Sequence, residues 1–151
     1  MGNDVRKLAF DGYPGSNILG TDIFPAYLDA GHLFYNDKDT CPIKFLRADI
    51  FECPVSFEQR EDGELAPLSQ TKDLSQLRGS MTHVYTSSVF HLFDEATQYQ
   101  LALRLASLLK RVPGAIIFGR HQGLQEEGKI SDPPGMRSVL LAIRAARIRR
   151  Y

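Results

Sequence analysis

The sequence has no excess of either charge, few cysteines and no long apolar run. Its 18 lysines and arginines balance 18 aspartates and glutamates over 151 residues, so no net field draws the protein to nucleic acid or to a membrane surface. Two cysteines, Cys41 and Cys53, are too few for a disulfide framework or a paired-cysteine metal site, and we expect reduced thiols and no metal. No stretch approaches the roughly 18 apolar residues of a membrane span, and no secretory signal pattern opens the chain. We therefore expect one cytoplasmic domain.

Short apolar runs alternate with helical patterns along the chain. The expected strands cover 17–23, 43–51, 82–88 and 114–120. The expected helices cover 3–11, 24–36, 94–110 and, at the arginine-rich end, 136–151. The polar stretch 53–80 is expected to be a long loop with helical turns around 74–77. Because the strands are mostly apolar rather than alternating, we expect burial on both faces and a doubly wound α/β fold with a mostly parallel sheet.

Polar residues lie at or just past the carboxyl end of each expected strand, at the edge where open α/β sheets bind ligands. They are Asp22, Asp49, Ser87 and Ser88 with nearby His91, and Arg120 with His121. Gly2 precedes the first expected helix, whose N-terminus favours negative charge. An acid at the end of a strand can accept hydrogen bonds from both hydroxyls of a ribose. This pattern predicts a nucleotide-like ligand.

Each of these residues also has a purely structural interpretation. A strand-end aspartate can form a turn or cap a helix, and Ser87 and Ser88 can simply be small turn residues. His91 lies among apolar neighbours and can be a semi-buried histidine, and Arg120 can belong to a solvated loop. We expect His32 at the surface of its helix and the terminal arginines on a solvated face rather than on nucleic acid.

Five segments carry a family resemblance: DVRKLAFDG, NILGTDIFPAYLDAGHLFYND, FLRADIFE, VYTSSVFHLFDEATQYQLALRLASLLK and PGAIIFGRHQG. They resemble the fungal class I methyltransferases that use S-adenosylmethionine in natural-product pathways, notably those of terpenoids and meroterpenoids. The similarity runs from about residue 2 to residue 123. It implies a partial, Rossmann-like methyltransferase domain over 1–123 and a divergent tail over 124–151 with the basic amphipathic helix.

The resemblance implies cofactor contacts residue by residue. Asp22 would hold the ribose hydroxyls of S-adenosylmethionine, and Ile23 would flank the adenine. Asp49, with Ile50 beside it, would meet the adenine amino group. Gly2 would remain from the glycine-rich cofactor loop.

The resemblance also implies an acceptor side. Ser87 and Ser88 would approach the methionine end of the cofactor, and His91 and Phe93 would line the acceptor, a small terpenoid or polyketide-like molecule. A hydroxyl acceptor would need a base to take its proton, for which His91 is the first candidate, whereas a carboxylate acceptor would need none.

One central strand of the family would lie before Met1, and the final strand pair of the family has no counterpart in 124–151. The central strand belongs between the strands equivalent to 17–23 and 82–88, so we expect two exposed central edges. The alternatives to an active enzyme are an inactive relative and a subunit that covers these edges with another chain, as in a homo-oligomer. A nicotinamide-dependent oxidoreductase would share Asp22, but no Tyr-x-x-x-Lys pair supports it.

Overall fold

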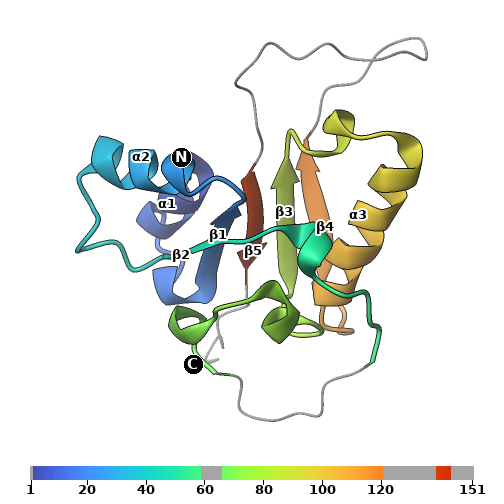
Figure 1. Ribbon diagram of the computed structural model, residues 1–151. Coiled ribbons are helices and arrows are strands. Elements are labelled where there is room, and N and C mark those ends of the chain that lie inside the picture. Colours follow the sequence, from blue (N-terminus) through green and yellow to red (C-terminus); the bar gives the residue numbers. More distant parts are fainter. Residues whose placement is uncertain (1, 59–65, 121–138, 144–151) are drawn as a thin grey trace.

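A computed structural model of the chain describes residues 2–58 and 66–120 and the backbone of 139–143. Five strands form one sheet in the order β2-β1-β5-β3-β4 (Figure 1). Their bounds are Ile18–Asp22 for β1, Lys44–Arg47 for β2, His83–Ser87 for β3, Ile116–Arg120 for β4 and Val139–Ile143 for β5. β1 pairs in parallel with β2, and β3 with β4, whereas β5 runs antiparallel to both β1 and β3. The prediction of a mostly parallel sheet is therefore confirmed in part: four strands run in one direction, but both pairings of β5 are antiparallel.

β5 lies between β1 and β3, where the resemblance predicted two exposed edges. Gly20 of β1 and Tyr85 of β3 share one partner in β5, Leu141. The expectation of open central edges is therefore wrong, and so is the helix expected over 136–151, at least at 139–143. A helix satisfies its own backbone groups and cannot pair with an edge, whereas an extended segment satisfies both edges at once. The rest of the predicted tail, 124–138 and 144–151, lies outside the described residues.

The three expected internal helices form close to their predicted bounds. They are α1 (Asn3–Phe10), α2 (Pro25–Tyr35) and α3 (Glu95–Leu108). Short 3₁₀ turns cover Gly15–Asn17, Ile50–Glu52, Leu68–Gln70, Leu74–Leu77 and Phe90–Leu92. The turn predicted around 74–77 in the long loop is thus confirmed. Asp94 caps α3 as expected, because its Oδ1 accepts a hydrogen bond of 2.8 Å from the amide of Thr97.

The core is divided between the two faces of the sheet. Successive side chains of a strand point to opposite faces. Ile18 of β1 packs in one cluster with Val5 of α1, and its neighbour Leu19 packs in the other with Leu101 of α3. Helices therefore cover both faces, which is the arrangement of a partial Rossmann-like α/β fold.

Two expected strands differ from their predictions. β4 pairs only with β3 among the described strands, and Ile116 and Phe118 are 47% and 44% exposed. The buried strand predicted over 114–120 is therefore an exposed edge strand, because it has a neighbour on one side only. β2 ends at Arg47, four residues before the predicted end at 51, since Ile50–Glu52 forms a 3₁₀ turn.

Cys41 and Cys53 form no disulfide, as expected. Cys53 packs in the α3-side cluster and Cys41 against the α1-side cluster, so the sheet separates them. Within the described residues, no group of three His, Cys, Asp or Glu side chains could hold a metal ion. None of the helices that the structure describes has the length and apolarity to cross a membrane.

Candidate functional site

The carboxyl ends of β1, β2, β3 and β4 lie at one edge of the sheet, where open α/β folds bind ligands. Thr21 of β1 and Thr86 of β3 share the partner Leu140 in β5. The next residues along these two strands, Asp22 and Ser87, therefore stand level with each other. They are two strand spacings apart, which is about 10 Å. The register thus brings two of the predicted site residues to one edge.

Asp22 is the most constrained acid at this edge, with only 4% of its surface exposed. Its Oδ1 accepts a hydrogen bond of 2.9 Å from the amide of Phe24. Its Oδ2 is buried and has no hydrogen-bond partner among the described residues. Burial raises the pKa of the Asp22 carboxyl, against the smaller opposing effect of the Phe24 amide. A buried oxygen without a donor is costly, so Oδ2 is suited to accept a hydrogen bond from a ligand.

Asp49 caps a turn, which is one of the structural roles that an aspartate at the end of a strand can have. Its Oδ1 accepts a hydrogen bond of 2.9 Å from the amide of Phe51 and so caps the 3₁₀ turn after β2. The Phe51 ring meets the Phe93 ring edge to face at 5.2 Å, which joins this turn to the segment after β3. Ile50 is 8% exposed and belongs to the core, whereas Ile23 is 42% exposed beside Asp22.

Ser87 and Ser88 are tied to the end of β4. The Ser88 amide donates to the carbonyl of Arg120 at 2.8 Å, and Arg120 Nε donates to Ser87 Oγ at 3.3 Å. Ser88 has a φ of 58°, a left-handed conformation that residues other than glycine adopt uncommonly. His91 lies half-buried in the Phe90–Leu92 turn that follows. His121 lies outside the described residues.

Gly2 precedes α1 with a left-handed φ of 75°, and a Cβ there would come within 2.8 Å of Phe45 Cε1. Both the conformation and the close approach require glycine. The Tyr85 hydroxyl of β3 donates to Asp4 Oδ2 at 3.2 Å. The first turn of α1 is therefore held close to β3.

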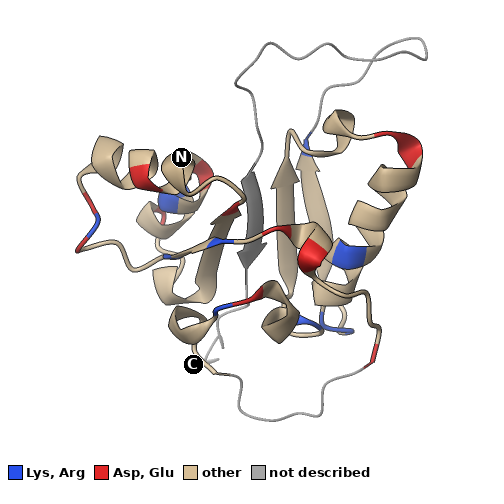
Figure 2. Cartoon of the chain, viewed as in Figure 1, with Lys and Arg blue, Asp and Glu red and all other residues tan. Residues whose placement is uncertain are grey.

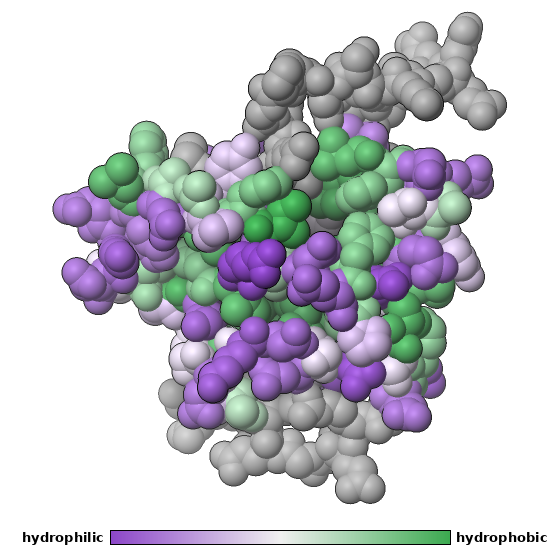
Figure 3. Space-filling view, viewed as in Figure 1, coloured by the Kyte–Doolittle hydropathy of each residue, from purple (hydrophilic) through white to green (hydrophobic). Residues whose placement is uncertain are grey.

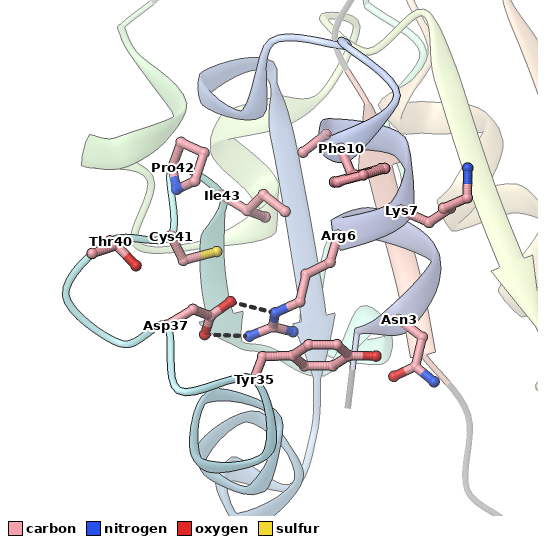
Figure 4. Close-up of a pocket in the computed structure, with 11 residues that line it drawn as sticks. Asn3, Arg6, Lys7, Phe10, Tyr35, Asp37, Thr40, Cys41, Pro42 and Ile43 are labelled. Carbon is pink, nitrogen blue, oxygen red and sulfur yellow. Dashed lines mark hydrogen bonds and ion pairs between the residues drawn. The ribbon is translucent and has the colours of Figure 1, made fainter.

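A largely buried ion cluster lies near α1, and no motif in the sequence predicts it. Arg6 donates from Nε and Nη2 to the two carboxylate oxygens of Asp37, at 2.6 and 3.0 Å (Figure 4). Its guanidinium lies 4.7 Å from each of the ring centres of Tyr35 and Phe45. The Arg6 guanidinium, more than any other group, holds the pKa of Asp37 well below its usual range.

His32 belongs to the same cluster, so its expected surface position is wrong. It is half-buried, and its Nδ1 lies 2.8 Å from Asp37 Oδ1. No sequence signal points to this contact set, because Arg6 and Asp37 are 31 residues apart and lie on different elements. Only the packing of α1 against α2 brings them together.

The edge therefore offers a buried hydrogen-bond acceptor next to an exposed apolar side chain. Asp22 and Ile23 supply these two features, with Ser87 at the same level across β5. A ligand that carries hydroxyl donors next to a flat apolar ring matches this pair of features. A nucleoside has that chemistry.

The chain was compared with protein-family models, solved structures and curated proteins. No family model and no solved structure matches it. It is 31% identical to the O-methyltransferase phiE of Fungal sp. (strain ATCC 74256) over 133 residues, which are 88% of this chain and 39% of that protein. It is 29% identical to the Asnovolin E/Chermesin D methyltransferase nvfJ of Aspergillus novofumigatus over 80% of this chain and 37% of that protein.

A third relative is the methyltransferase trt5 of Aspergillus terreus, 27% identical over 87% of this chain and 42% of that protein. The chain thus spans about two fifths of the length of these relatives, while most of its own length aligns with them. The aligned share and the agreement among several relatives establish common descent. This chain is a distant homologue of the fungal natural-product methyltransferases.

Proposed function

We propose that this chain binds S-adenosylmethionine at the carboxyl edge of its sheet and supports methyl transfer to an oxygen of a small natural product. The observation that carries the proposal is the buried Oδ2 of Asp22, which lacks a donor among the described residues of a methyltransferase homologue. The ribose of the cofactor presents two adjacent hydroxyl donors, and Oδ2 can accept from them. Hydrogen bonds to the charged carboxylate would also offset the cost of burying it.

The other proposed contacts follow the same edge. Ile23, being 42% exposed, can flank the adenine. Asp49 is engaged in a turn through Oδ1, and its second oxygen can accept from the adenine amino group, with Ile50 beneath it in the core. Ser87 and Ser88 stand across β5 from Asp22, about where the methionine end would lie, and Gly2 allows the close approach of α1.

The cofactor would supply a methyl group on a positively charged sulfonium, so the chain itself needs few catalytic groups. Its residues hold the acceptor oxygen in line with that methyl group, which can account for several kcal/mol of the barrier. If the acceptor is a hydroxyl, its proton passes to a base, and we assign this role to His91 beside Phe93. If the acceptor is a carboxylate, no proton is transferred.

β5 supports an alternative, an inactive relative or partner subunit. It runs antiparallel between β1 and β3. In the resemblance, the strand at this place is followed by the glycine-rich cofactor loop. A different chain direction there alters the part of the edge that would receive the methionine end. Binding of the cofactor product without any methyl transfer would favour this alternative.

Calorimetric titration of the full chain with S-adenosylhomocysteine tests the cofactor assignment. We expect binding, and we expect Asp22→Asn to weaken it at least tenfold, since the variant loses the charged acceptor. Asp39→Asn, which changes an exposed acid on the loop after α2, is the matched control and should bind as the wild type does. Absence of binding at millimolar ligand by a folded chain would overturn the assignment. Binding of NAD in its place would favour the oxidoreductase reading.

A further inference from the structure

Asp4, in the first turn of α1, is an exposed acid whose side chain is held in place by a hydrogen bond. Its Oδ2 accepts this bond, of 3.2 Å, from the hydroxyl of Tyr85 in β3. No lysine, arginine or histidine forms an ion pair with Asp4 in the part of the chain that the structure describes. Asp4 therefore differs from Asp11 and Asp37, each of which pairs with a cation of α1.

The contacts at the start of α1 place this acid over the middle of the sheet. The Phe45 ring fills the space above Gly20 of β1 and also lies against Gly2, since a Cβ on either glycine would meet it at 2.7 or 2.8 Å. On β3 the contact is made by Tyr85, which is level with Gly20 because both pair with Leu141. The start of α1 therefore spans β5 from β1 to β3.

Asp22 and Ser87 belong to the same face of the sheet as α1. Ile18 packs in the α1-side cluster and Tyr85 packs against it, and side chains alternate between the two faces along a strand. Counting in steps of two from these residues brings Asp22 and Ser87 to that face as well. They lie roughly 7 Å beyond the row of Gly20 and Tyr85, toward the carboxyl edge. Figure 2 shows acidic positions both at the tip of β1 and at the start of α1.

This face of the edge presents two acids in different environments. The Oδ2 of Asp22 is buried without a donor among the described residues, which suits a hydroxyl. Asp4 is exposed and its charge is not balanced by a described residue, which suits an ammonium group with its three donors. Ile23 beside Asp22 is 42% exposed, and Figure 3 shows hydrophobic side chains on the surface around the upper ends of the strands. The matching ligand has hydroxyls, an apolar ring and an ammonium group on a short chain.

We propose that Asp4 binds the α-ammonium group of S-adenosylmethionine and that the Tyr85 hydroxyl is the positioning group that orients it. This inference rests on the proposed cofactor assignment and extends it from the ribose to the amino-acid end. A hydrogen bond between an ammonium and a carboxylate is roughly twice as strong as one between neutral groups. The carboxylate of the same amino-acid end is repelled by Asp4, so only the ammonium gains from this contact.

Calorimetric titration of the full chain with two ligands tests the proposal. One ligand is S-adenosylhomocysteine, and the other is its deaminated analogue, which keeps the nucleoside, the thioether and the carboxylate. The wild type should bind the analogue about tenfold more weakly, because a hydrogen bond between charged groups is lost. In Asp4→Asn the two ligands should bind with similar affinity, since the amide keeps the shape of the side chain but not its charge. Tyr85→Phe should narrow the difference to about threefold, because Asp4 loses the hydroxyl that orients it.

Asp11→Asn is the matched control, because it neutralises an acid at the opposite end of α1 and should keep the tenfold preference. Asp22→Asn should weaken both ligands by the same factor, since both carry the ribose. Circular dichroism checks that each variant folds. An unchanged preference in Asp4→Asn, or a wild type that binds both ligands equally, would overturn this inference and leave the cofactor assignment standing. A folded wild type that binds neither ligand would overturn both.

Discussion

The fold shifts the pKa values of two carboxylates, Asp22 and Asp37, in opposite directions. Burial raises the pKa of Asp22, and its Oδ2 has no donor among the described residues. Arg6 lowers the pKa of Asp37 by binding both of its oxygens. An ionised Asp22 therefore destabilises the ligand-free fold, and an ionised Asp37 stabilises it. The first pattern is typical of a residue kept for binding, and the second of a structural contact.

Asp22→Asn should stabilise the ligand-free protein at neutral pH. The folded pKa of Asp22 lies above its ordinary 3.8, so the wild type loses stability as pH rises from 3.8 through the folded pKa, and the loss persists above it. Asparagine carries no charge and escapes this loss. We expect a melting temperature about 2–4 °C above that of the wild type at pH 7, with the difference shrinking toward pH 4. Thermal melts across this range measure it, and a lower melting temperature at pH 7 would contradict it.

Asp37→Asn should destabilise the protein by about 1–3 kcal/mol at pH 7, because it leaves the largely buried Arg6 without its anion. The folded pKa of Asp37 is depressed, so its contribution is complete above 3.8 and is lost as pH falls below that value. The difference from the wild type should therefore be constant from pH 7 to about 4 and then shrink. Urea unfolding measures it.

Asp11→Asn is the matched control for Asp37→Asn. It breaks an ion pair with Lys7 in which both side chains are more than half exposed. Exposed pairs contribute little, so we expect a change below about 0.5 kcal/mol. Equal effects of the two substitutions would show that the Arg6 cluster adds no stability.

At the scale of elements, α3 and α1 are held in different ways. α3 has a side-chain cap at Asp94 and a row of buried leucines that includes Leu101 and Leu105. α1 has no side-chain cap, and it is tied to the rest of the fold by the Arg6 cluster and by the bond from Tyr85 to Asp4. α3 depends on local sequence, whereas α1 depends on distant partners.

Asp94→Ala should lower the free energy of unfolding by about 1 kcal/mol, since the amide of Thr97 loses its acceptor at the start of α3. Urea unfolding monitored by circular dichroism measures the change. The slope of the free energy of unfolding against urea concentration should stay the same. Glu95→Ala, in the first turn of the same helix, keeps the cap and should cost only a few tenths of a kcal/mol. A loss no larger than that control would mean that core packing alone sets the start of α3.

At the scale of the whole molecule, β5 joins two halves of the sheet. β2 and β1 form one parallel pair, and β3 and β4 form the other. β1 and β3 are not neighbours in the described sheet, and each pairs with β5 instead. The integrity of the sheet, and with it the level placement of Asp22 and Ser87, therefore depends on β5.

Leu141→Pro should destabilise the whole sheet by about 3 kcal/mol or more, because proline removes an amide from a central strand. Hydrogen exchange should show β1 and β3 losing protection together, since Leu141 is the partner of both Gly20 and Tyr85. Leu141→Ile keeps the amide and is the control. If β1 and β3 kept their protection in the proline variant, β5 would not lie between them.

The local sequence pattern was enough to predict the helices α1, α2 and α3, the cap at Asp94 and the buried strand that ends at Asp22. The early end of β2 follows from a local turn at Ile50–Glu52, but three other failures are non-local. His32 was expected at the surface because its helix does not reveal Asp37, and 114–120 was expected to be buried because an apolar run does not reveal an edge. The terminal segment has helical periodicity, but in an extended form 139–143 also satisfies the backbone groups of two strand edges, which a helix would leave open.

By itself, the sequence determined the α/β class, the order of elements up to β4, the strand-end positions of Asp22, Asp49, Ser87 and Ser88, and the resemblance to methyltransferases. These depend on periodicity, capping and motif spacing, which act over a few residues. Only the tertiary structure decided that β5 closes the sheet, that one oxygen of Asp22 is buried without a described donor, and that Arg6 meets Asp37. Pairing, burial and ion contacts depend on segments that are distant along the chain, and packing alone brings those segments together.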